Sequence, residues 1–244
     1  MRTVGVIQCR FGSARLPGKA LRALRGRPLL SHVIERVQAT SGLDEVILAT
    51  SESERDTAIV SVAATYGVRT WRGSEHDVLG RIRDAARWAN ADVVVRVTAD
   101  CPLWAPDVGS RVIEAYHALC VAPSVTGQSV YVWNDTCRSG YPDGLDVEVF
   151  SMWLLDQAAA STYRSEDREH VTPGIRRLAL NVGTVRAPFN LTRLKLSVDR
   201  EIDLALVASV VRHITPGDFS WDETARALVL AGVIASEDVA EAAV

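Results

Sequence analysis

The chain has 244 residues, of which 48% are hydrophobic and 23% charged, with a formal net charge of −3. These proportions are typical of folded globular proteins and disfavour collagen-like, coiled-coil and disordered chains. The nearly neutral balance also argues against a protein that coats nucleic acid, which usually has a strongly basic face. No run of eighteen apolar residues occurs, so we expect a cytoplasmic protein without a membrane span.

Short apolar segments alternate with amphipathic ones along the first half of the chain. The pattern predicts strands at residues 3–8, 45–50, 68–72 and 92–98, and helices at 28–38, 55–66, 76–89 and 106–120. Such alternation favours right-handed βαβ crossovers and a mostly parallel sheet that is covered on both faces.

The second half of the chain has a different pattern. Strands are expected at 129–133, 145–150, 180–186 and 193–198, and helices at 152–162, 166–177, 202–213 and 220–244. The first two of these strands are only about a dozen residues apart, which indicates a mixed or antiparallel segment. No long linker divides the chain. We therefore expect one domain of the α/β class, with a Rossmann-like three-layer α/β/α sandwich and a mostly parallel mixed sheet.

A basic, glycine-containing segment, QCRFGSARLPGK at residues 8–19, directly follows the first expected strand. Glycines let backbone amides face an anion, and fixed guanidinium and ammonium groups neutralise its oxygens. Open α/β sheets bind ligands at the carboxyl ends of their strands. The segment matches neither GxxxxGK[ST] nor GxGxxG, so it predicts a polyphosphate site of another kind.

The string RxGSxRLPGKxL in this segment resembles the signature loop of the cytidylyltransferases that activate acidic sugars. That family includes the CMP-sialic acid and CMP-ketodeoxyoctonate synthetases, and the resemblance is greatest to its spore-coat polysaccharide SpsF branch. Further matching segments are EVILATS (45–51), WRGSEHDVLGR (71–81), VTADCPL (97–103), YPDGLDVEVF (141–150), REHVTP (168–173) and LSVDREIDL (196–204). The resemblance covers most of the chain and implies a homodimer and Mg²⁺ as cofactor.

The resemblance also implies roles for individual residues. Catalysis is assigned to Arg15, Lys19 and Asp100, and Mg²⁺ to Asp100 and Asp199, since this ion prefers one or two carboxylates together with phosphate oxygens. The alternative for Ser74 and Asp199 is that each caps a helix, and the alternative for Arg72 is an exposed surface cation. The implied nucleotide-binding residues are Gln8, Arg10, Gly12, Ser13, Arg15, Lys19, Thr50, Arg72, Ser74 and Asp77.

The acceptor half of the site is expected around residues 122–192, which the resemblance also associates with dimerisation. The implied acceptor-binding residues are Tyr141, Asp143, Asp146, Glu148, Arg168 and His170. Arginine suits carboxylate, phosphate and phosphonate groups, so an anionic acceptor is expected. Asp146 and Glu148 should alternate on one strand and face the metal; the alternative is that they bind backbone or arginine partners.

The resulting hypothesis is an enzyme that transfers CMP from CTP to an acidic sugar or sugar phosphate and releases pyrophosphate. Positioning and charge neutralisation provide most of the catalysis in such reactions, which agrees with the lack of any covalent-nucleophile motif. The alternatives are a phosphonate or other natural-product acid as acceptor, a different nucleotide, and a non-catalytic nucleotide-binding protein. A nicotinamide-dependent oxidoreductase is disfavoured by the cationic first loop. The expected partners are CTP and a small anion, without nucleic acid or membrane.

Overall fold

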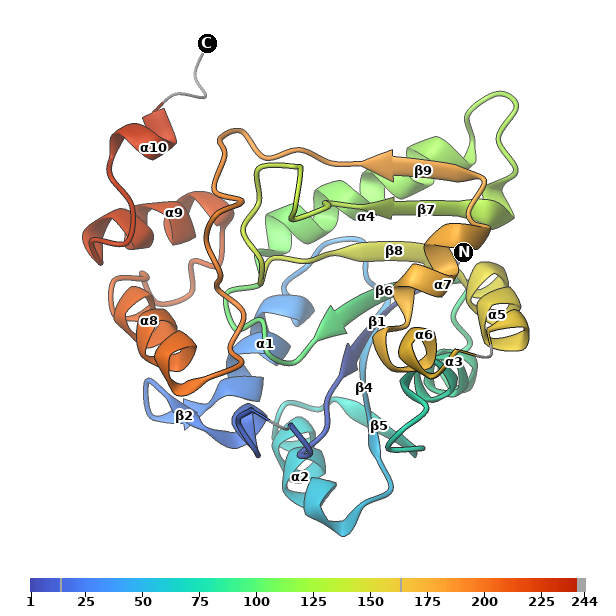
Figure 1. The fold of residues 1–244 in the computed structure, drawn as a ribbon, viewed down its shortest axis with the longest axis horizontal. Coiled ribbons are helices and arrows are strands. Elements are labelled where there is room, and N and C mark those ends of the chain that lie inside the picture. The colour runs from blue at the N-terminus through green and yellow to red at the C-terminus, as the bar shows by residue number, and fades with distance from the viewer. Residues whose placement is uncertain (14, 163, 241–244) are drawn as a thin grey trace.

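The computed structural model describes residues 1–13, 15–162 and 164–240. Its central sheet contains β1 (Thr3–Gln8), β4 (Glu45–Ser51), β5 (Arg69–Gly73), β6 (Val93–Thr98), β7 (Val130–Trp133), β8 (Glu148–Ser151) and β9 (Asn181–Thr184). Figure 1 shows these strands side by side in the order β5-β4-β1-β6-β8-β7-β9. A small hairpin of β2 (Ala23–Leu24) and β3 (Arg27–Pro28) lies apart from them.

The sheet is mixed and mostly parallel, as the sequence predicts. Strands β5, β4, β1 and β6 are parallel to one another. Strand β8 is antiparallel to both β6 and β7, and β9 is parallel to β7. Strand β4 lies on one side of β1 and β6 on the other, so the strand order reverses between β1 and β6. Open α/β sheets bind their ligands at such a point.

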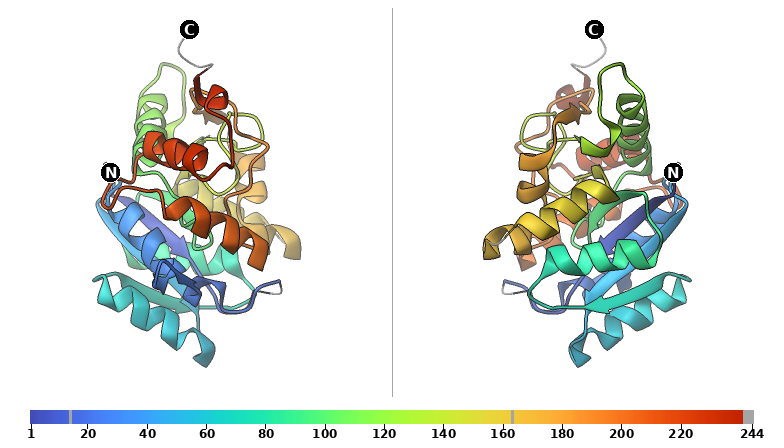
Figure 2. Two further views of the ribbon diagram at one scale, coloured as in Figure 1. Left: turned by 90° about the vertical axis from the view of Figure 1, so that its left-hand side faces the viewer. Right: turned by 90° about the vertical axis from the view of Figure 1, so that its right-hand side faces the viewer.

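Helices cover both faces of the sheet (Figure 2). The core on one face contains side chains of α1 (Leu29–Gln38), α2 (Thr57–Thr65), α4 (Pro106–Cys120), α8 (Glu201–Val211) and α9 (Trp221–Leu230). The core on the other face contains side chains of α3 (Val78–Trp88), α5 (Met152–Ser161) and α7 (Thr172–Leu178). The remaining helices are α6 (Ser165–His170) and α10 (Glu237–Ala240). The expected three-layer fold is therefore confirmed.

The central strands are apolar on both sides because both of their faces are buried. Val4 and Val6 of β1 belong to one core, whereas Ile7 belongs to the other, since successive strand side chains point to opposite faces. All three side chains are fully buried. This is why the segment is a continuous apolar run rather than an alternating one.

Four expected elements differ from the structure by more than a residue or two. The expected helix at 166–177 is divided into α6 and α7 at Val171, which has a φ of 68°; Pro173 follows, and its ring lacks the N–H that would continue the first helix. The expected helix at 220–244 ends at Leu230, and Gly232 (φ 67°) follows at a left-handed turn. Residues 241–244 lie outside the described residues.

The other two differences concern strands. The expected strand at 193–198 is wrong: this segment forms only an isolated bridge, between Asp143 and Lys195. The expected strand at 145–150 begins at Glu148. Residues 142–146 form a turn instead, in which Asp146 accepts the N–H of Gly144 at 2.9 Å. Asp146 and Glu148 therefore do not alternate on one strand, contrary to the expectation.

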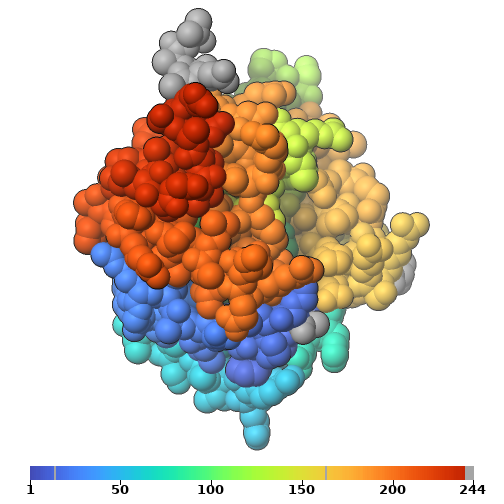
Figure 3. All heavy atoms as spheres, turned by 60° about the vertical axis from the view of Figure 1, so that its left-hand side comes forward, coloured from blue at the N-terminus to red at the C-terminus, as the bar shows by residue number. Residues whose placement is uncertain are grey.

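The C-terminal segment packs against the N-terminal one. Figure 3 shows orange residues of this segment in contact with blue N-terminal residues on one face of the molecule. Arg22 pairs with Glu201 at the start of α8, and Arg25 donates to the carbonyl of Val211 at its end. Within the described part of the chain, no helix is both long and apolar enough to cross a membrane.

Candidate active site

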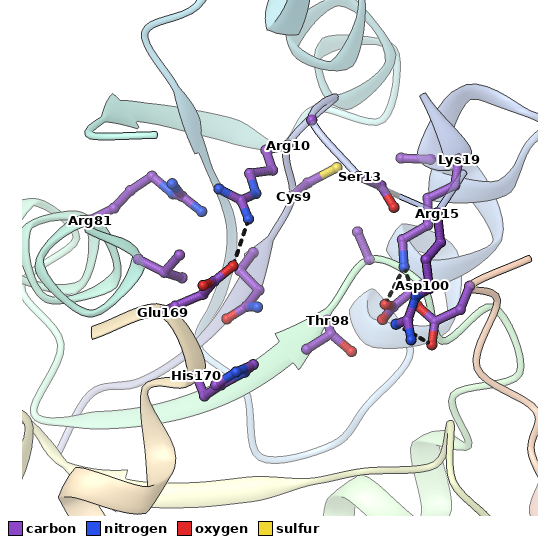
Figure 4. A pocket seen from close by; sticks show the side chains of 16 residues that line it. Cys9, Arg10, Ser13, Arg15, Lys19, Arg81, Thr98, Asp100, Glu169 and His170 are labelled. Carbon is purple, nitrogen blue, oxygen red and sulfur yellow. Dashed lines mark hydrogen bonds and ion pairs between the residues drawn. The ribbon is translucent and has the colours of Figure 1, made fainter. Parts of the chain in front are cut away.

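A cavity of about 550 Å³ opens at the carboxyl ends of β1 and β6, where the strand order reverses. It is lined by Gln8 and Cys9 from the end of β1 and by Thr98 from the end of β6; Figure 4 shows Cys9 and Thr98 among the lining side chains. The remaining lining residues come from the basic loop, from the turn after β6, from α3, from α6 and from the segment just before α8: Arg10, Gly12, Ser13, Arg15, Lys19, Ala20, Val78, Arg81, Ala99, Asp100, Glu169, His170 and Asp199.

The basic loop is held in place by backbone contacts around Phe11. Its carbonyl accepts the N–H of Gly18 at 3.0 Å, and its N–H donates to the Asp56 carboxylate at 2.8 Å. Gly18 has a φ of 67°, and a Cβ there would lie 2.8 Å from the Phe11 ring. Only glycine satisfies both conditions without strain. The turn directs Lys19 back into the cavity.

Lys19 lies between two carboxylates at one end of the cavity (Figure 4). Its Nζ is 2.6 Å from Asp100 Oδ2 and 3.0 Å from Asp199 Oδ1, and Arg15 is 2.8 Å from Asp199 Oδ2. Burial disfavours the charge of Lys19, but the two carboxylates outweigh it and raise the pKa. Burial likewise opposes ionisation of Asp199, yet Lys19 and Lys195 lower its pKa to about 2.

The opposite end of the cavity contains a second group of charges. Arg10 pairs with Glu169 of α6 at 3.0 Å. Arg81 of α3 is buried, and its Nη1 donates to the carbonyls of Ser74 and Glu75. Burial and the nearby Arg10 lower the pKa of Arg81. Neither Arg81 nor Glu169 is among the residues that the resemblance implies, although both belong to its matching segments.

Nine of the residues implied by the resemblance line this one cavity: Gln8, Arg10, Gly12, Ser13, Arg15, Lys19, Asp100, His170 and Asp199. They come from four separate stretches of the chain. Their assembly around one opening depends on β1 and β6 being neighbours in the sheet.

Four implied nucleotide-binding residues have structural roles outside the cavity. Thr50 is fully buried and donates to Asp56. Arg72 donates from Nε to the Ser51 carbonyl at 3.0 Å. Ser74 accepts the N–H of Asp77 at 3.0 Å, and Asp77 caps α3 by accepting from Gly80. The cap of α3 is therefore Asp77 and not Ser74, whose hydroxyl accepts from the cap residue instead.

Most of the implied acceptor residues also lie away from the cavity. Arg168 pairs with Asp77 across α6 and α3. Tyr141 is fully buried and packs against Trp221. Only His170 is among the lining residues.

The three implied carboxylates of this half are buried or partly buried. Asp143 accepts from Ser197, and Asp146 accepts from Thr136. Burial raises the pKa of both carboxyls. Glu148 accepts from the Tyr131 hydroxyl at 2.6 Å and pairs with Arg96 at 2.5 Å. The alternative of backbone and arginine partners is thus the one observed for Asp146 and Glu148.

Asp56 is a positioning residue that the sequence analysis missed. Its buried carboxylate accepts from the Phe11 N–H, the Thr50 hydroxyl, and both the N–H and hydroxyl of Ser51. Burial opposes its ionisation, but these donors lower its pKa. The contacts fasten the basic loop to the end of β4. No local pattern identifies Asp56, since its partners lie in two other segments.

The donor set at the Lys19 end suits a divalent cation. Asp100 and Asp199 both reach the same ammonium group, so their oxygens are close enough to bind one cation. Two carboxylates completed by phosphate oxygens and water are a usual Mg²⁺ environment. The described residues contain no group of three or more His, Cys, Asp or Glu side chains that holds a metal alone. A metal here would therefore take its remaining ligands from water or from a bound substrate.

Comparison with known proteins agrees with this geometry. SpsF, the spore coat polysaccharide biosynthesis protein of Bacillus subtilis, is 30% identical over 207 residues, which is 81% of each chain. A cytidylyltransferase of Leptospira borgpetersenii superposes with a TM-score of 0.86 at 24% identity over 96% of each chain. A CMP:2-keto-3-deoxy-manno-octonic acid synthetase solved with CTP superposes with a TM-score of 0.65 at 17% identity, over 87% of this chain and 99% of the other.

The two structural similarities concern the fold, whereas the family follows from the sequence itself. A family model described as cytidylyltransferase matches residues 4–209, which contain every residue that lines the cavity. The chain belongs to the cytidylyltransferase family, and its fold is that of a nucleotidyltransferase enzyme.

Proposed function

We propose that this enzyme transfers CMP from CTP to a small anionic acceptor and releases pyrophosphate. The observation that carries the proposal is the placement of Lys19 and Arg15 beside Asp100 and Asp199, at the reversal point of the sheet. Cations for a triphosphate and carboxylates for its metal meet there, in a cavity of about 550 Å³. The family membership supports CTP as the nucleotide.

The reaction requires an acceptor oxygen to attack the α-phosphorus of CTP while the bond to the bridging oxygen of pyrophosphate breaks. Negative charge then grows on the leaving phosphates. Lys19 and Arg15 are placed to bind those oxygens, and fixed donors of this kind each contribute about 2.7–4 kcal/mol. Mg²⁺ held by Asp100 and Asp199 supplies further charge neutralisation at the phosphates when it is bound. No side chain has to form a covalent bond with the substrate.

The acceptor is proposed to be an acidic sugar or sugar phosphate. The end of the cavity opposite Lys19 contains Arg10, Arg81 and His170, with Glu169 as the counter-charge of Arg10. An excess of guanidinium groups favours a carboxylate, phosphate or phosphonate on the acceptor. The expected homodimer and cytoplasmic location remain predictions.

The test is pyrophosphate release from each of the four ribonucleoside triphosphates, with a panel of acidic sugars, sugar phosphates and phosphonates. We expect turnover with CTP and at least one of these acceptors, with the CMP conjugate identified by ³¹P NMR. Turnover with a phosphonate alone would select the alternative acceptor class. Binding of CTP without turnover on any acceptor would contradict the proposal and favour a nucleotide-binding protein.

A variant pair tests the roles of the residues. Asp100→Asn should abolish metal-dependent turnover while the thermal unfolding temperature stays near that of the wild type, because Asp100 is partly exposed. Asp84→Asn is the matched control, since among the described residues its carboxylate pairs with Arg83 of α3 alone and it does not line the cavity. Retained activity in Asp100→Asn would remove this residue from the metal site.

A further inference from the structure

Two carboxylates and one ammonium group form a compact cluster in the nucleotide-free protein. The Lys19 side chain is only 15% exposed, and its Nζ contacts Asp100 Oδ2 at 2.6 Å and Asp199 Oδ1 at 3.0 Å. Among the described residues, Lys19 is the one cation that pairs with both carboxylates. Its ammonium group lies where a cation shared by Asp100 and Asp199 would have to bind.

The other cations of the cluster bind differently. Arg15 and Lys195 contact Asp199 through its second oxygen, at 2.8 and 3.1 Å. Both side chains are more exposed than Lys19, at 58% and 41%. Lys195 is also held by Asp203 at 2.9 Å, away from Asp100. These two cations can keep their contacts when the space between Asp100 and Asp199 is taken by another ion.

We propose that Lys19 acts as a stand-in for the divalent cation and leaves the two carboxylates only when a triphosphate attracts it. The proposal rests on the proposed function, because it takes Asp100 and Asp199 as the metal ligands. An ammonium group and a divalent ion repel each other at such short range, so they cannot share these oxygens. Oxygens of a triphosphate offer Lys19 an equally charged partner, and its departure opens the metal site.

Positive coupling between nucleotide and metal follows from this exchange. The free protein binds divalent cations weakly because the metal must displace Lys19. Nucleotide binding removes that competitor, and by linkage the metal strengthens nucleotide binding by the same factor. The device ensures that metal and triphosphate enter the site together.

The test measures Mn²⁺ binding to the nucleotide-free protein by electron paramagnetic resonance at constant ionic strength. Lys19→Met should bind Mn²⁺ about tenfold more tightly than the wild type, because the competing charge is gone. Adding Asp100→Asn to this variant should remove the gain. Unchanged Mn²⁺ affinity in Lys19→Met would overturn the proposal.

Lys195→Met is the matched control. It removes one positive charge from the same cluster, but that charge contacts Asp199 alone of the two metal ligands. We expect its Mn²⁺ affinity to change less than about threefold, since only long-range attraction differs. An equal gain in both variants would show that net charge, and not occupancy of the site by Lys19, sets the Mn²⁺ affinity. That result would overturn the proposed exchange.

A measurement on the wild type keeps the test decisive if Lys19→Met does not fold. The ¹⁵N-ammonium NMR signal of Lys19 can be assigned by its loss in Lys19→Arg. CTP without metal should shift this signal, whereas Mg²⁺ alone at similar concentration should leave it unchanged. A shift with Mg²⁺ alone would contradict the exchange.

The outcome is separable from that of the proposed function. The Mn²⁺ measurement contains no nucleotide, so it can succeed in a protein that transfers no CMP. Conversely, an active cytidylyltransferase whose Lys19→Met variant binds Mn²⁺ no better than the wild type would overturn the exchange alone.

Discussion

The buried Asp56 carboxylate offers the sharpest test of how the basic loop is held. One of its oxygens accepts from the Phe11 N–H at 2.8 Å. The other accepts from the Thr50 hydroxyl at 2.8 Å and from the N–H and hydroxyl of Ser51 at 2.9 and 2.6 Å. Asp56→Asn keeps the shape of the side chain but replaces one acceptor oxygen by an NH₂ donor. Placed at the first oxygen, this NH₂ faces the Phe11 N–H.

The expected cost follows from that geometry. One buried donor loses its acceptor, and the remaining bonds lose their charge, so the free energy of unfolding should fall by about 2–4 kcal/mol. For a chain of this size, that corresponds to a fall in Tm of about 5–10 °C. Release of Phe11 also frees the loop that carries Arg15 and Lys19, so KM for the nucleotide should rise.

The assay combines thermal unfolding by circular dichroism with nucleotide-dependent pyrophosphate release. Glu54→Gln is the matched control, because this carboxylate lies in the same short helix, η2 (Glu54–Asp56), and is exposed. It should change neither Tm nor KM. A Tm for Asp56→Asn within about 1 °C of the wild type would refute the reasoning, since losing a buried hydrogen-bond acceptor should cost more stability than that.

Three further predictions concern stability. Arg96→Met should destabilise the protein by about 3–5 kcal/mol in urea unfolding, because it leaves the buried Glu148 without its charged partner. The double variant Arg96→Met with Glu148→Gln should recover part of this loss, and no recovery would contradict the pairing. Gly144→Ala should lower the melting temperature far more than Gly26→Ala. A Cβ at Gly144 (φ 103°) would lie 2.4 Å from a backbone nitrogen, whereas one at Gly26 (φ 78°) would meet nothing within 4 Å. Equal melting temperatures would show that the turn can relax. In the folded protein the pKa of Asp199 is lowered to about 2, below the ordinary value of 3.8. Its contribution to stability is therefore present above about pH 4 and is lost as the pH falls toward 2. Asp199→Asn should lack this part of the acid unfolding profile, and an unchanged profile would contradict the lowered pKa.

Local sequence determined the strands and helices of the first half of the chain. The apolar run at 3–8 and the helix at 28–38 are found almost as expected, as β1 and α1, because burial alone imposes their patterns. Arg15 and Lys19 of the loop motif line the same cavity, since the spacing of glycines and cations in one loop is a local property.

Tertiary structure decided which motif residues face the cavity. Within the segment 71–81, the resemblance implies roles for Arg72, Ser74 and Asp77. The residues of this segment that line the cavity are instead Val78 and Arg81, both in the first turn of α3 after its Asp77 cap. Spacing along the chain shows which residues lie near one another. The direction in which each side chain points depends on its hydrogen-bond partners, which come from other segments.

The carboxylates show the same division. Asp100 and Asp199 are 99 positions apart in the sequence. Both reach Lys19 because the segment before α8 packs against the end of β6. A hydrogen bond from the Val198 N–H to the Asp100 carbonyl, at 2.8 Å, joins the two segments. The sequence by itself therefore determined the fold class and the kinds of charge that the site contains. The tertiary structure alone decided that Lys19 lies between the two carboxylates, because long-range packing, and not local propensity, sets the distance between charges from different segments.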